Sequence, residues 1–417
     1  MRVSKVLFKE VLKHVDYYSR FNPSPLSIEK FLQFGSYLFL KNFYKSIDLL
    51  QYRISFRPRS VKELPVRIAN IMKELHLLPN RLLETPSVEL VNSWYEQSFG
   101  ELISYENASP DTSLLEKFCN NLIKIRNRHS NVVQTMAEGI IELKKTAIMD
   151  PHLEHCIQYF LNRFYMSRIS IRMLINQHAA LFGSDLNSQP PRNIGCIDPN
   201  CDVKSIAMDA YDNSKFLCDQ YYMTSPPIEI ETYNALDVGG PVTLVYTPSH
   251  LYHILFELYK NAMRAVVELH GDGSDIPPIK TVIVKSHEDV TIKISDKGGG
   301  IPRSLRDVLF HYMYSTAPKP SASGIDSAPL AGFGYGLPIS RLYARYFQGD
   351  LMISSMEGYG TDAIVYLKVL SSEANELLPI FNKTSSKHYT NAKQGTHDWS
   401  SGSNTNGNEK WKMSIGL

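Results

Sequence analysis

The sequence predicts a multidomain α and α/β protein, in which an N-terminal helical bundle precedes an α/β sandwich domain. The chain has 417 residues, which suggests two or three domains at about 150 residues each. Apolar residues recur at intervals of three and four up to about residue 180, whereas short β-rich runs follow residue 202. Residues 183–202 are rich in Gly, Pro, Asn and Asp, which is typical of a loop or interdomain linker.

The composition is that of a globular protein. Hydrophobic residues make up 43% of the chain and charged residues 21%, which excludes a wholly disordered chain. The net charge of +2 argues against a dedicated nucleic-acid binder. No run approaches 18 consecutive apolar residues, so no membrane-spanning helix is expected. The five scattered cysteines predict reduced structural thiols rather than a disulfide framework: Cys119, Cys156, Cys196, Cys201 and Cys218.

We assign residues 1–183 to the helical bundle and residues 184–202 to the linker. Prolines stand where helices should begin or end, at Pro65, Pro79, Pro86, Pro110 and Pro151. The basic, amphipathic N-terminus fits an ordinary first helix or an organellar targeting helix, and Glu10 and Asp16 favour the former. Lys41–Lys62 mixes basic and aromatic residues, which fits a solvated helix or loop better than a nucleic-acid surface.

Residues 203–384 form the predicted α/β domain. Its strands are expected at 242–246, 281–285, 290–294, 351–354 and 363–367, and its main helices at 251–268 and 339–347. Residues 385–417 are predicted to form a flexible C-terminal tail, because the stretch from 391 to 409 is polar and small.

Two segments carry acidic and amide groups suited to chemistry. His253, Glu257 and Asn261 are spaced by four and therefore share one helix face, where a carboxylate and an amide could hold a metal and a reacting hydroxyl. A solvated polar face explains that spacing equally well. Asp296 ends an alternating strand and is followed by Gly298–Gly300, which lets backbone approach a ligand closely, although a tight turn explains it too.

Two further segments are rich in glycine. Gly332, Gly334 and Gly336 alternate before a helix, whose N-terminus favours anions, so the run is a plausible phosphate cradle. Residues 358–363 turn into the last strand and could be a simple β-turn. The chain has no Gly-Lys dipeptide and no His-Arg-Asp, which excludes a Walker-type loop and the catalytic loop of ordinary protein kinases.

In this order the four segments resemble the N, G1, G2 and GT boxes of the gyrase, Hsp90, histidine kinase and MutL superfamily of ATP-binding domains. Further segments closely resemble the mitochondrial pyruvate dehydrogenase kinases, namely residues 21–35, 63–70, 126–142, 163–178, 195–201 and 328–351. The resemblance therefore covers most of the chain. Residues 36–62 depart from it, because the family has a shorter, polar connection there.

The resemblance implies an ATP-dependent serine protein kinase of the mitochondrial matrix that phosphorylates and inactivates the E1α subunit of the pyruvate dehydrogenase complex, regulating glucose and pyruvate oxidation. A branched-chain 2-oxoacid dehydrogenase kinase, an Hsp90-like ATP-driven clamp and a protein-histidine kinase stay as alternatives. The implied partners are E1α, the lipoyl domain of the acetyltransferase core, a second copy of the chain and pyruvate-like small carboxylates as inhibitors. The implied cofactors are ATP and Mg²⁺.

The resemblance also implies roles for individual residues. Glu257 matches the general base, His253 would orient it, and Asn261 matches the Mg²⁺ ligand. Asp296 matches the carboxylate that reads adenine, and Thr361 would support it. The residues implied to contact ATP are Glu257, Leu258, Tyr259, Lys260, Asn261, Ala262, Met263, Arg264, Asp296, Gly298, Gly300, Ser315, Thr316, Gly332, Phe333, Gly334, Tyr335, Gly336, Leu337 and Thr361.

Two more implied sites lie outside the ATP domain. A regulatory pocket for pyruvate-like carboxylates is implied at Tyr95, Ser98, His129, Arg168, Ile171 and Arg172. Arg168 suits a carboxylate because its fork of donors can bind both oxygens. Asp398 and Trp399 match a tail motif that crosses to the partner subunit of a homodimer.

Overall fold

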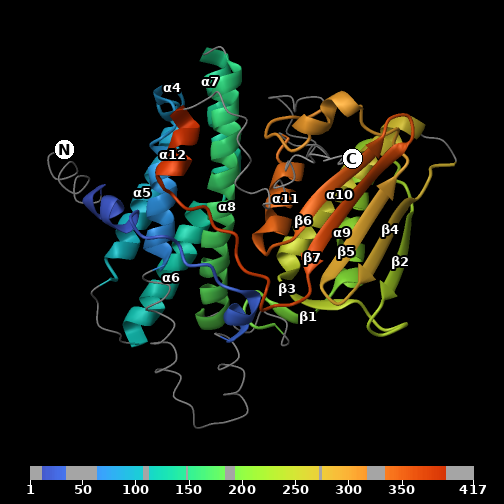
Figure 1. Ribbon diagram of the computed structural model, residues 1–417, viewed down its shortest axis with the longest axis horizontal. Coiled ribbons are helices and arrows are strands. Elements are labelled where there is room, and N and C mark those ends of the chain that lie inside the picture. The colour runs from blue at the N-terminus through green and yellow to red at the C-terminus, as the bar shows by residue number, and fades with distance from the viewer. Residues whose placement is uncertain are drawn as a thin grey trace, which may run out of the picture.

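Figure 1 gives the computed structural model, in which a group of helices stands beside a sheet covered by helices. The structure describes residues 12–33, 63–106, 112–146, 149–183, 193–271, 275–316 and 334–390.

The helical half is arranged around one long helix. Helices at 12–18, 28–33 and 63–75 are followed by α4 (Asn80–Leu83), α5 (Pro86–Ile103), α6 (Thr112–Arg128), α7 (Val132–Thr146) and α8 (Pro151–Phe182). Pro151 starts α8 at a position where its missing N–H costs nothing, and the Asp150 side chain accepts a hydrogen bond from the Leu153 N–H. Most of α8 is buried, because it packs against α6 on one side and α11 (Gly336–Tyr346) on the other. This helix is therefore the link between the two halves.

The second half contains a five-stranded mixed sheet. Its strands, in spatial order, are β2 (Ile228–Asn234), β4 (Ile279–Lys285), β5 (Asp289–Asp296), β7 (Gly360–Lys368) and β6 (Asp350–Met356). The pair β2–β4 is parallel and the other neighbours are antiparallel. A separate antiparallel pair is formed by β1 (Asp198–Asp202) and β3 (Thr243–Tyr246).

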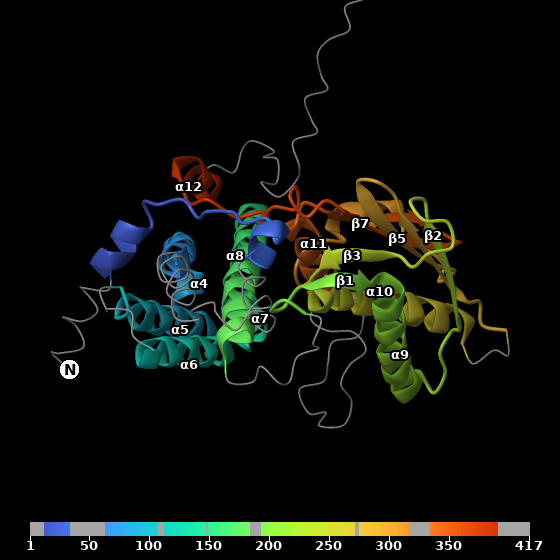
Figure 2. The same cartoon turned by 90° about the horizontal axis from the view of Figure 1, so that it is seen from below.

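Helices α9 (Val203–Tyr222), α10 (Pro248–His270) and α11 cover one face of this sheet, as Figure 2 shows. A row of apolar side chains crosses the covered face: Ile283, Ile292, Val365 and Leu351 are in register on neighbouring strands and buried. Burying this alternating apolar set against the helices fixes the strand register, since a slip of one residue would expose it. None of the described helices lies on the opposite face.

The end of the described chain returns to the helical half. Asn375 forms an isolated bridge with Ser27, and the Glu376 carboxylate accepts hydrogen bonds from the Leu26 N–H at 2.9 Å and from Arg67 at 2.7 Å. Glu376 also accepts a hydrogen bond from the Tyr346 hydroxyl of α11. One buried carboxylate thus connects the beginning of the chain, the helical bundle and α11 of the second half.

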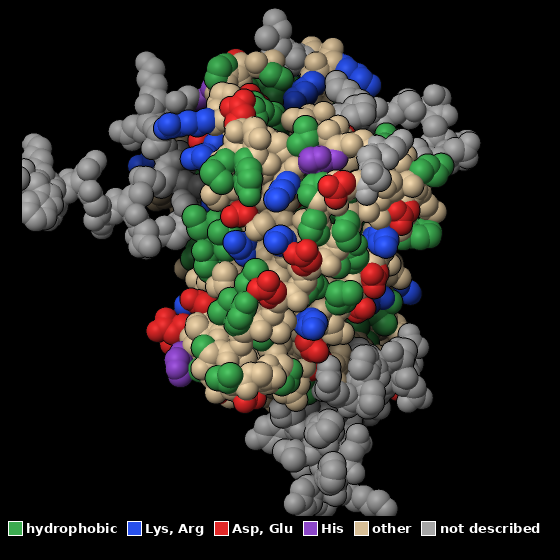
Figure 3. Space-filling model, turned by 90° about the vertical axis from the view of Figure 1, so that its right-hand side faces the viewer, with side chains coloured by type: hydrophobic (Ala, Val, Ile, Leu, Met, Phe, Trp, Pro, Cys, Tyr) green, Lys and Arg blue, Asp and Glu red, His purple; other side chains and the backbone are tan. Residues whose placement is uncertain are grey.

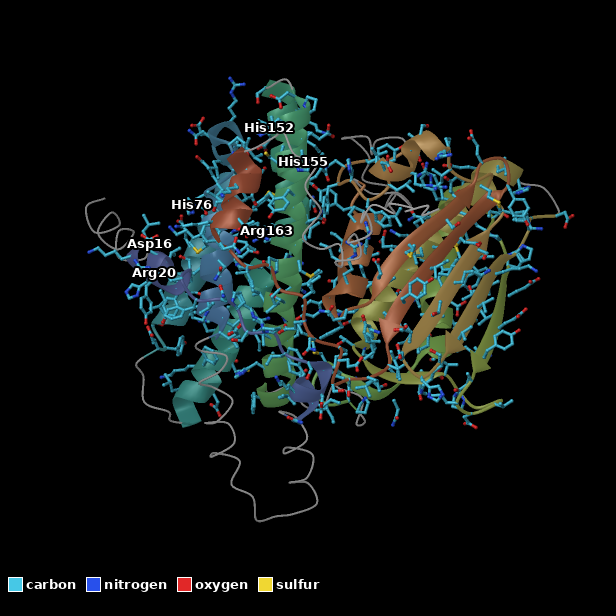
Figure 4. The ribbon with its side chains drawn as sticks, viewed as in Figure 1. Asp16, Arg20, His76, His152, His155 and Arg163 are labelled. Carbon is cyan, nitrogen blue, oxygen red and sulfur yellow. The ribbon has the colours of Figure 1, made fainter. Side chains whose placement is uncertain are left out.

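A second buried ion pair joins α8 to the bundle. Arg163 lies on the side of α8 that faces the bundle (Figure 4) and pairs with Glu74. It also donates to the Ile380 carbonyl at 2.8 Å, just before α12 (Lys383–Thr390), which packs on α8.

The fold agrees with the predicted order of helical and α/β halves. Strands at all five predicted places are present, with ends that differ by a few residues, and the helices predicted at 251–268 and 339–347 are α10 and α11. The prediction left out β2, although Ile228 and Ile230 alternate with glutamates there. It was wrong in placing residues 198–202 in the linker, since they form β1. Residues 385–390 belong to α12 rather than to a flexible tail, and 391–417 lie outside the described residues.

All five cysteines are free, as predicted. Among the described helices, none is long and apolar enough to cross a membrane.

Candidate nucleotide site and regulatory pocket

The main cavity of the second half lies between α10, the end of β5 and the start of α11. Its volume is about 490 Å³, which is in the range of small-molecule sites. Nearly all of the elements that border it end or begin there, so backbone as well as side-chain groups are accessible to a ligand. The cavity brings together members of all four segments that the sequence singled out, among them Glu257, Asn261, Asp296, Gly334 and Thr361.

Asp296 stands at the closed end of the cavity. Its Oδ1 accepts hydrogen bonds from the backbone N–H of Gly298 at 2.8 Å and of Thr361 at 3.3 Å. Burial nevertheless raises the pKa of Asp296 to about 6, because the two N–H donors only partly offset the loss of water. The bonds hold the carboxylate in one orientation, and its second oxygen can accept from an amine of a bound base.

Two glycines are required for this shape. A Cβ at Gly298 would lie 2.5 Å from the Ala265 Cβ of α10, so a larger residue would push the turn away from the helix. Gly300 has a φ of +70°, in the left-handed region that favours glycine. Beside them, the Ser355 hydroxyl accepts from the Ile301 N–H at 2.7 Å and lies 3.0 Å from the Thr361 hydroxyl. This part of the cavity wall is therefore made of closely packed backbone turns.

The polar face of α10 borders the opposite end. Glu257 forms an ion pair with Lys260 at 2.7 Å, and only 17% of the Glu257 side chain is exposed. A Cβ at Gly336 would collide with the Glu257 carboxylate, so α11 begins directly against it. Asn261, one turn further along α10, is exposed to the cavity.

His253 lies one turn before Glu257 and is half-buried. Burial lowers the pKa of His253, with the Glu257 charge acting in the opposite direction and Lys260 adding to the lowering. The ring is therefore neutral near pH 7. Its Nε2 has no hydrogen-bond partner among the described residues, and its ring packs on Tyr343 of α11, with the centroids 4.9 Å apart.

The predicted ATP-contacting residues divide into two groups. The cavity is lined by those that share an inward position: Glu257, Leu258, Asn261, Ala262, Arg264, Asp296, Gly298, Gly300, Ser315, Thr316, Gly334, Gly336, Leu337 and Thr361. Tyr259 and Met263 are instead buried among the helices, and the Tyr259 hydroxyl lies 3.0 Å from that of Thr281. Lys260 and Tyr335 do not line the cavity, while Gly332 and Phe333 lie outside the described residues.

Sequence reasoning missed the apolar wall of the cavity. Ile301, Pro302, Leu305, Leu309 and Ile353 line it. Leu305 belongs to the 3₁₀ helix η2 (Arg303–Val308), whose short span has no periodic signal. Ile301 and Pro302 directly follow the glycine run, which was the one available sign that this turn continues along the cavity.

The predicted regulatory residues meet in the helical half, between α5, the end of α6 and α8. The Ser98 hydroxyl lies 2.9 Å from His129 Nε2 and accepts from Arg128 at 2.8 Å. Arg168 donates to the backbone carbonyls of His129 and Ser130, at 3.1 and 3.3 Å.

Charges in this pocket are predominantly positive. Burial lowers the pKa of His129 to about 4, and Arg168, Arg128 and Arg172 add to the lowering, so the ring is neutral at pH 7. Burial also lowers the pKa of Arg172, with Arg168 adding to it. The Arg168 Nε and the buried Tyr95 hydroxyl have no hydrogen-bond partner within the described part of the chain. Positive charge and donors of this kind are suited to bind a small carboxylate. Ile171 is buried in α8, in contact with the core of the bundle.

Two family models match the chain. Residues 25–198 match the family described as mitochondrial branched-chain alpha-ketoacid dehydrogenase kinase. Residues 246–371 match the histidine kinase-, DNA gyrase B- and HSP90-like ATPases. The fold and the site thus define the class: a kinase whose ATP-binding domain is of the histidine kinase, gyrase B and Hsp90 type.

Relatives that match over nearly the whole chain specify the family. The chain is 56% identical to "[Pyruvate dehydrogenase (acetyl-transferring)] kinase, mitochondrial" of Drosophila melanogaster, covering 93% of this chain and 92% of the relative. It is 54% identical to isozyme 3 of Homo sapiens, covering 96% of each, and 54% identical to isozyme 3 of Mus musculus, covering 95% and 93%. The chain belongs to the family of mitochondrial pyruvate dehydrogenase (acetyl-transferring) kinases, as the sequence motifs predicted.

Proposed function

We propose that this chain uses ATP to phosphorylate serine on the E1α subunit of the pyruvate dehydrogenase complex, and that phosphorylation inactivates the complex and so restrains pyruvate and glucose oxidation. The observation that carries the proposal is the cavity in which Glu257, Asn261 and Asp296 meet, in a chain that matches pyruvate dehydrogenase kinases over more than nine-tenths of its length. The setting would be the mitochondrial matrix, since the relatives are named mitochondrial.

In this mechanism Asp296 accepts a hydrogen bond from the exocyclic amine of adenine, while the backbone around Gly298 and Thr361 supports the base. Glu257, at the other end of the cavity, takes the proton of the serine hydroxyl as general base. Neutral His253 behind it supplies a dipole that orients the carboxylate, and Lys260 forms an ion pair with the carboxylate at 2.7 Å. The start of α11, next to Glu257, presents free N–H groups to the phosphates.

Asn261 is the proposed ligand of Mg²⁺. Its side chain lies in the cavity wall one turn from Glu257, and an amide oxygen suits a cation that prefers oxygen ligands and completes its shell with substrate phosphates. When bound, the ion would neutralise charge on the phosphates during transfer. Within the described residues there is no cluster of three His, Cys, Asp or Glu side chains that would hold a metal without such help.

The regulatory pocket is proposed to bind pyruvate-like carboxylates. Arg168 and Arg172 supply positive charge, and the Arg168 Nε and Tyr95 hydroxyl supply donors that have no partner among the described residues. A carboxylate there would be held by charge-assisted hydrogen bonds.

The proposed macromolecular partners are E1α, the lipoyl domain of the acetyltransferase core and a second copy of the chain. The sheet face without a described helix is proposed as the homodimer contact. Val282, Lys293, Ile364 and Met352 follow one another across it in register, so this row is apolar except for Lys293. From the side that carries β2 and β4, Figure 3 shows hydrophobic side chains interspersed with charged ones. Asp398 and Trp399, the proposed crossing motif, lie outside the described residues.

The branched-chain 2-oxoacid dehydrogenase kinase is not favoured. The family model with that description covers residues 25–198 only, whereas the relatives that match the whole chain are named pyruvate dehydrogenase kinases. The test is to incubate the protein with labelled ATP and each purified E1 component in turn. We expect label on the serine of pyruvate dehydrogenase E1α and loss of that complex's activity. Labelling of the branched-chain component alone would refute the proposal.

A further inference from the structure

Two separate segments meet at one edge of the nucleotide cavity. We call residues 312–316 and 334–337 the cavity rim. The Met313 N–H donates to the Gly334 carbonyl at 3.2 Å, and a Cβ at Gly334 would collide with the Tyr314 backbone. Tyr314, Ser315 and Thr316 line the cavity together with Gly334 and Gly336. The position of either segment therefore depends on the other.

The rim contains an unfavourable backbone conformation. Met313 has a φ of +63°, in the left-handed region that side chains other than glycine seldom adopt. Such a residue persists only where the surrounding structure fixes it, and these positions concentrate at functional sites. The question is which groups fix Met313.

Helix α8 of the helical half supplies those groups. Gln158 Oε1 accepts from the Tyr312 N–H at 2.8 Å, and Gln158 Nε2 donates to the Tyr312 carbonyl at 3.2 Å. One amide side chain thus binds both polar backbone groups of the residue that precedes Met313. Asn162, one turn further along the same face of α8, accepts from the Tyr312 hydroxyl at 3.0 Å.

Packing on the same face supports these bonds. The Tyr312 side chain is 2% exposed, and its ring lies 5.4 Å from those of Tyr165 and Tyr335, centroid to centroid. Tyr335 belongs to the rim and precedes the first residue of α11. In Figure 1, α8 runs beside α11 along the boundary between the two halves. The contacts cross from the helical half to the ATP domain and bridge 150 or more residues of sequence.

We propose that Gln158 and Asn162 are positioning residues for phosphoryl transfer: through Tyr312 they hold the cavity rim in the conformation that receives the phosphates of ATP. Neither residue lines the cavity, so neither is catalytic. The proposal rests on the kinase function proposed above, and it assigns to the helical half a direct part in nucleotide binding.

The test compares Gln158→Leu and Asn162→Leu with the full-length parent. We expect each variant to raise the KM for ATP and the Kd of ATP by about tenfold, the order expected when buried hydrogen-bonding groups lose their partner. The KM for E1α should stay within about twofold, because the rim faces the nucleotide. Gln220→Leu, the same change at an exposed position of α9, is the matched control and should match the parent.

Conservative variants separate positioning from general stability. Asn162→Asp keeps an acceptor for the Tyr312 hydroxyl and should restore the affinity for ATP that Asn162→Leu loses. Gln158→Glu keeps the acceptor but repels the Tyr312 carbonyl, so its affinity should lie below that of the parent. If the leucine variants bind ATP as the parent does, or if Asn162→Asp is as weak as Asn162→Leu, the proposal is wrong. The affinity for ATP is measured by calorimetry and does not require phosphoryl transfer to E1α. The role of Gln158 and Asn162 can therefore be tested even if the proposed kinase function is wrong.

Discussion

The nucleotide cavity and the proposed regulatory site are built by opposite means. The cavity has turns, glycines and strand ends in its wall, and its most perturbed group is a carboxylate whose pKa is raised to about 6. The proposed regulatory site is formed by helix side chains, and burial lowers the pKa of its histidine, His129, to about 4. Both shifts are caused first by burial, which disfavours the charged form of either group.

Because their walls differ, the two sites should recognise different features of a ligand. A backbone-lined site with a fixed carboxylate reads the shape and the donors of a large ligand. A pocket with two arginines and a neutral histidine responds chiefly to negative charge. Substitutions should therefore have different signatures in the two regions: in the cavity they should act on turnover or ATP affinity, and in the pocket on inhibition.

The largest effect is expected at Glu257. Glu257→Gln should lower the rate of serine phosphorylation by about 10²–10⁴-fold, the usual contribution of a general base. Affinity for ATP, measured by calorimetry, should change little, because the amide keeps the size of the side chain. Glu288→Gln, at an exposed position in the β4–β5 turn, is the control. Normal turnover in Glu257→Gln would remove Glu257 from the base role.

Asp296 should affect binding instead. Asp296→Ala should weaken ATP binding by at least about 1–3 kcal/mol, because a buried amine would lose its acceptor. Asp289→Ala, at the opposite end of β5 where it pairs with Lys368, should leave the affinity unchanged. Equal ATP affinities for Asp296→Ala and the parent would contradict the assignment.

Arg168→Ala should act on inhibition. The concentration of pyruvate or dichloroacetate needed for half-inhibition should rise by about tenfold or more, since a charge-assisted hydrogen bond is lost. The measurement is a dose–response curve at fixed ATP, with turnover before addition of inhibitor as the reference. Arg81→Ala, an exposed arginine of α4, is the matched control. Overlaid curves for Arg168→Ala and the parent would make Arg168 a structural residue.

The smallest effect is a dependence on pH. With a pKa of about 6, Asp296 gains a proton as the pH falls through 6 and then no longer offers a charged acceptor. Affinity for ATP should therefore fall several-fold between about pH 7 and 5. Asp296→Asn, which cannot titrate, should lose this dependence. A parent whose ATP affinity follows the same pH curve as Asp296→Asn would show that another group titrates.

Local patterns were sufficient to predict much of the fold. Alternation in 290–294 and 363–367 indicated the central strands, because one face of each is buried. β1 could not be predicted, since its sequence, Asp-Pro-Asn-Cys-Asp, has no period and pairs only because β3 lies beside it. The motifs predicted that Asp296 and Asn261 share one site, and both line the cavity. The apolar wall of the cavity and the hydrogen bonds between Gln158 and Tyr312 instead depend on contacts between distant segments. No local pattern in the sequence specifies such contacts.

The return of the chain to Glu376 has a consequence for biosynthesis. Arg67 is fully enclosed, and its partner carboxylate emerges from the ribosome some three hundred residues later. Until then the guanidinium has Glu63 as a neighbour but lacks the carboxylate that encloses it, and a buried charge without its partner costs about 3–5 kcal/mol. The first half of the nascent chain therefore cannot settle into its final packing while the second half is still being made. We expect the helical half to reach its final packing only once the segment that carries Glu376 is available, so that the two halves fold together.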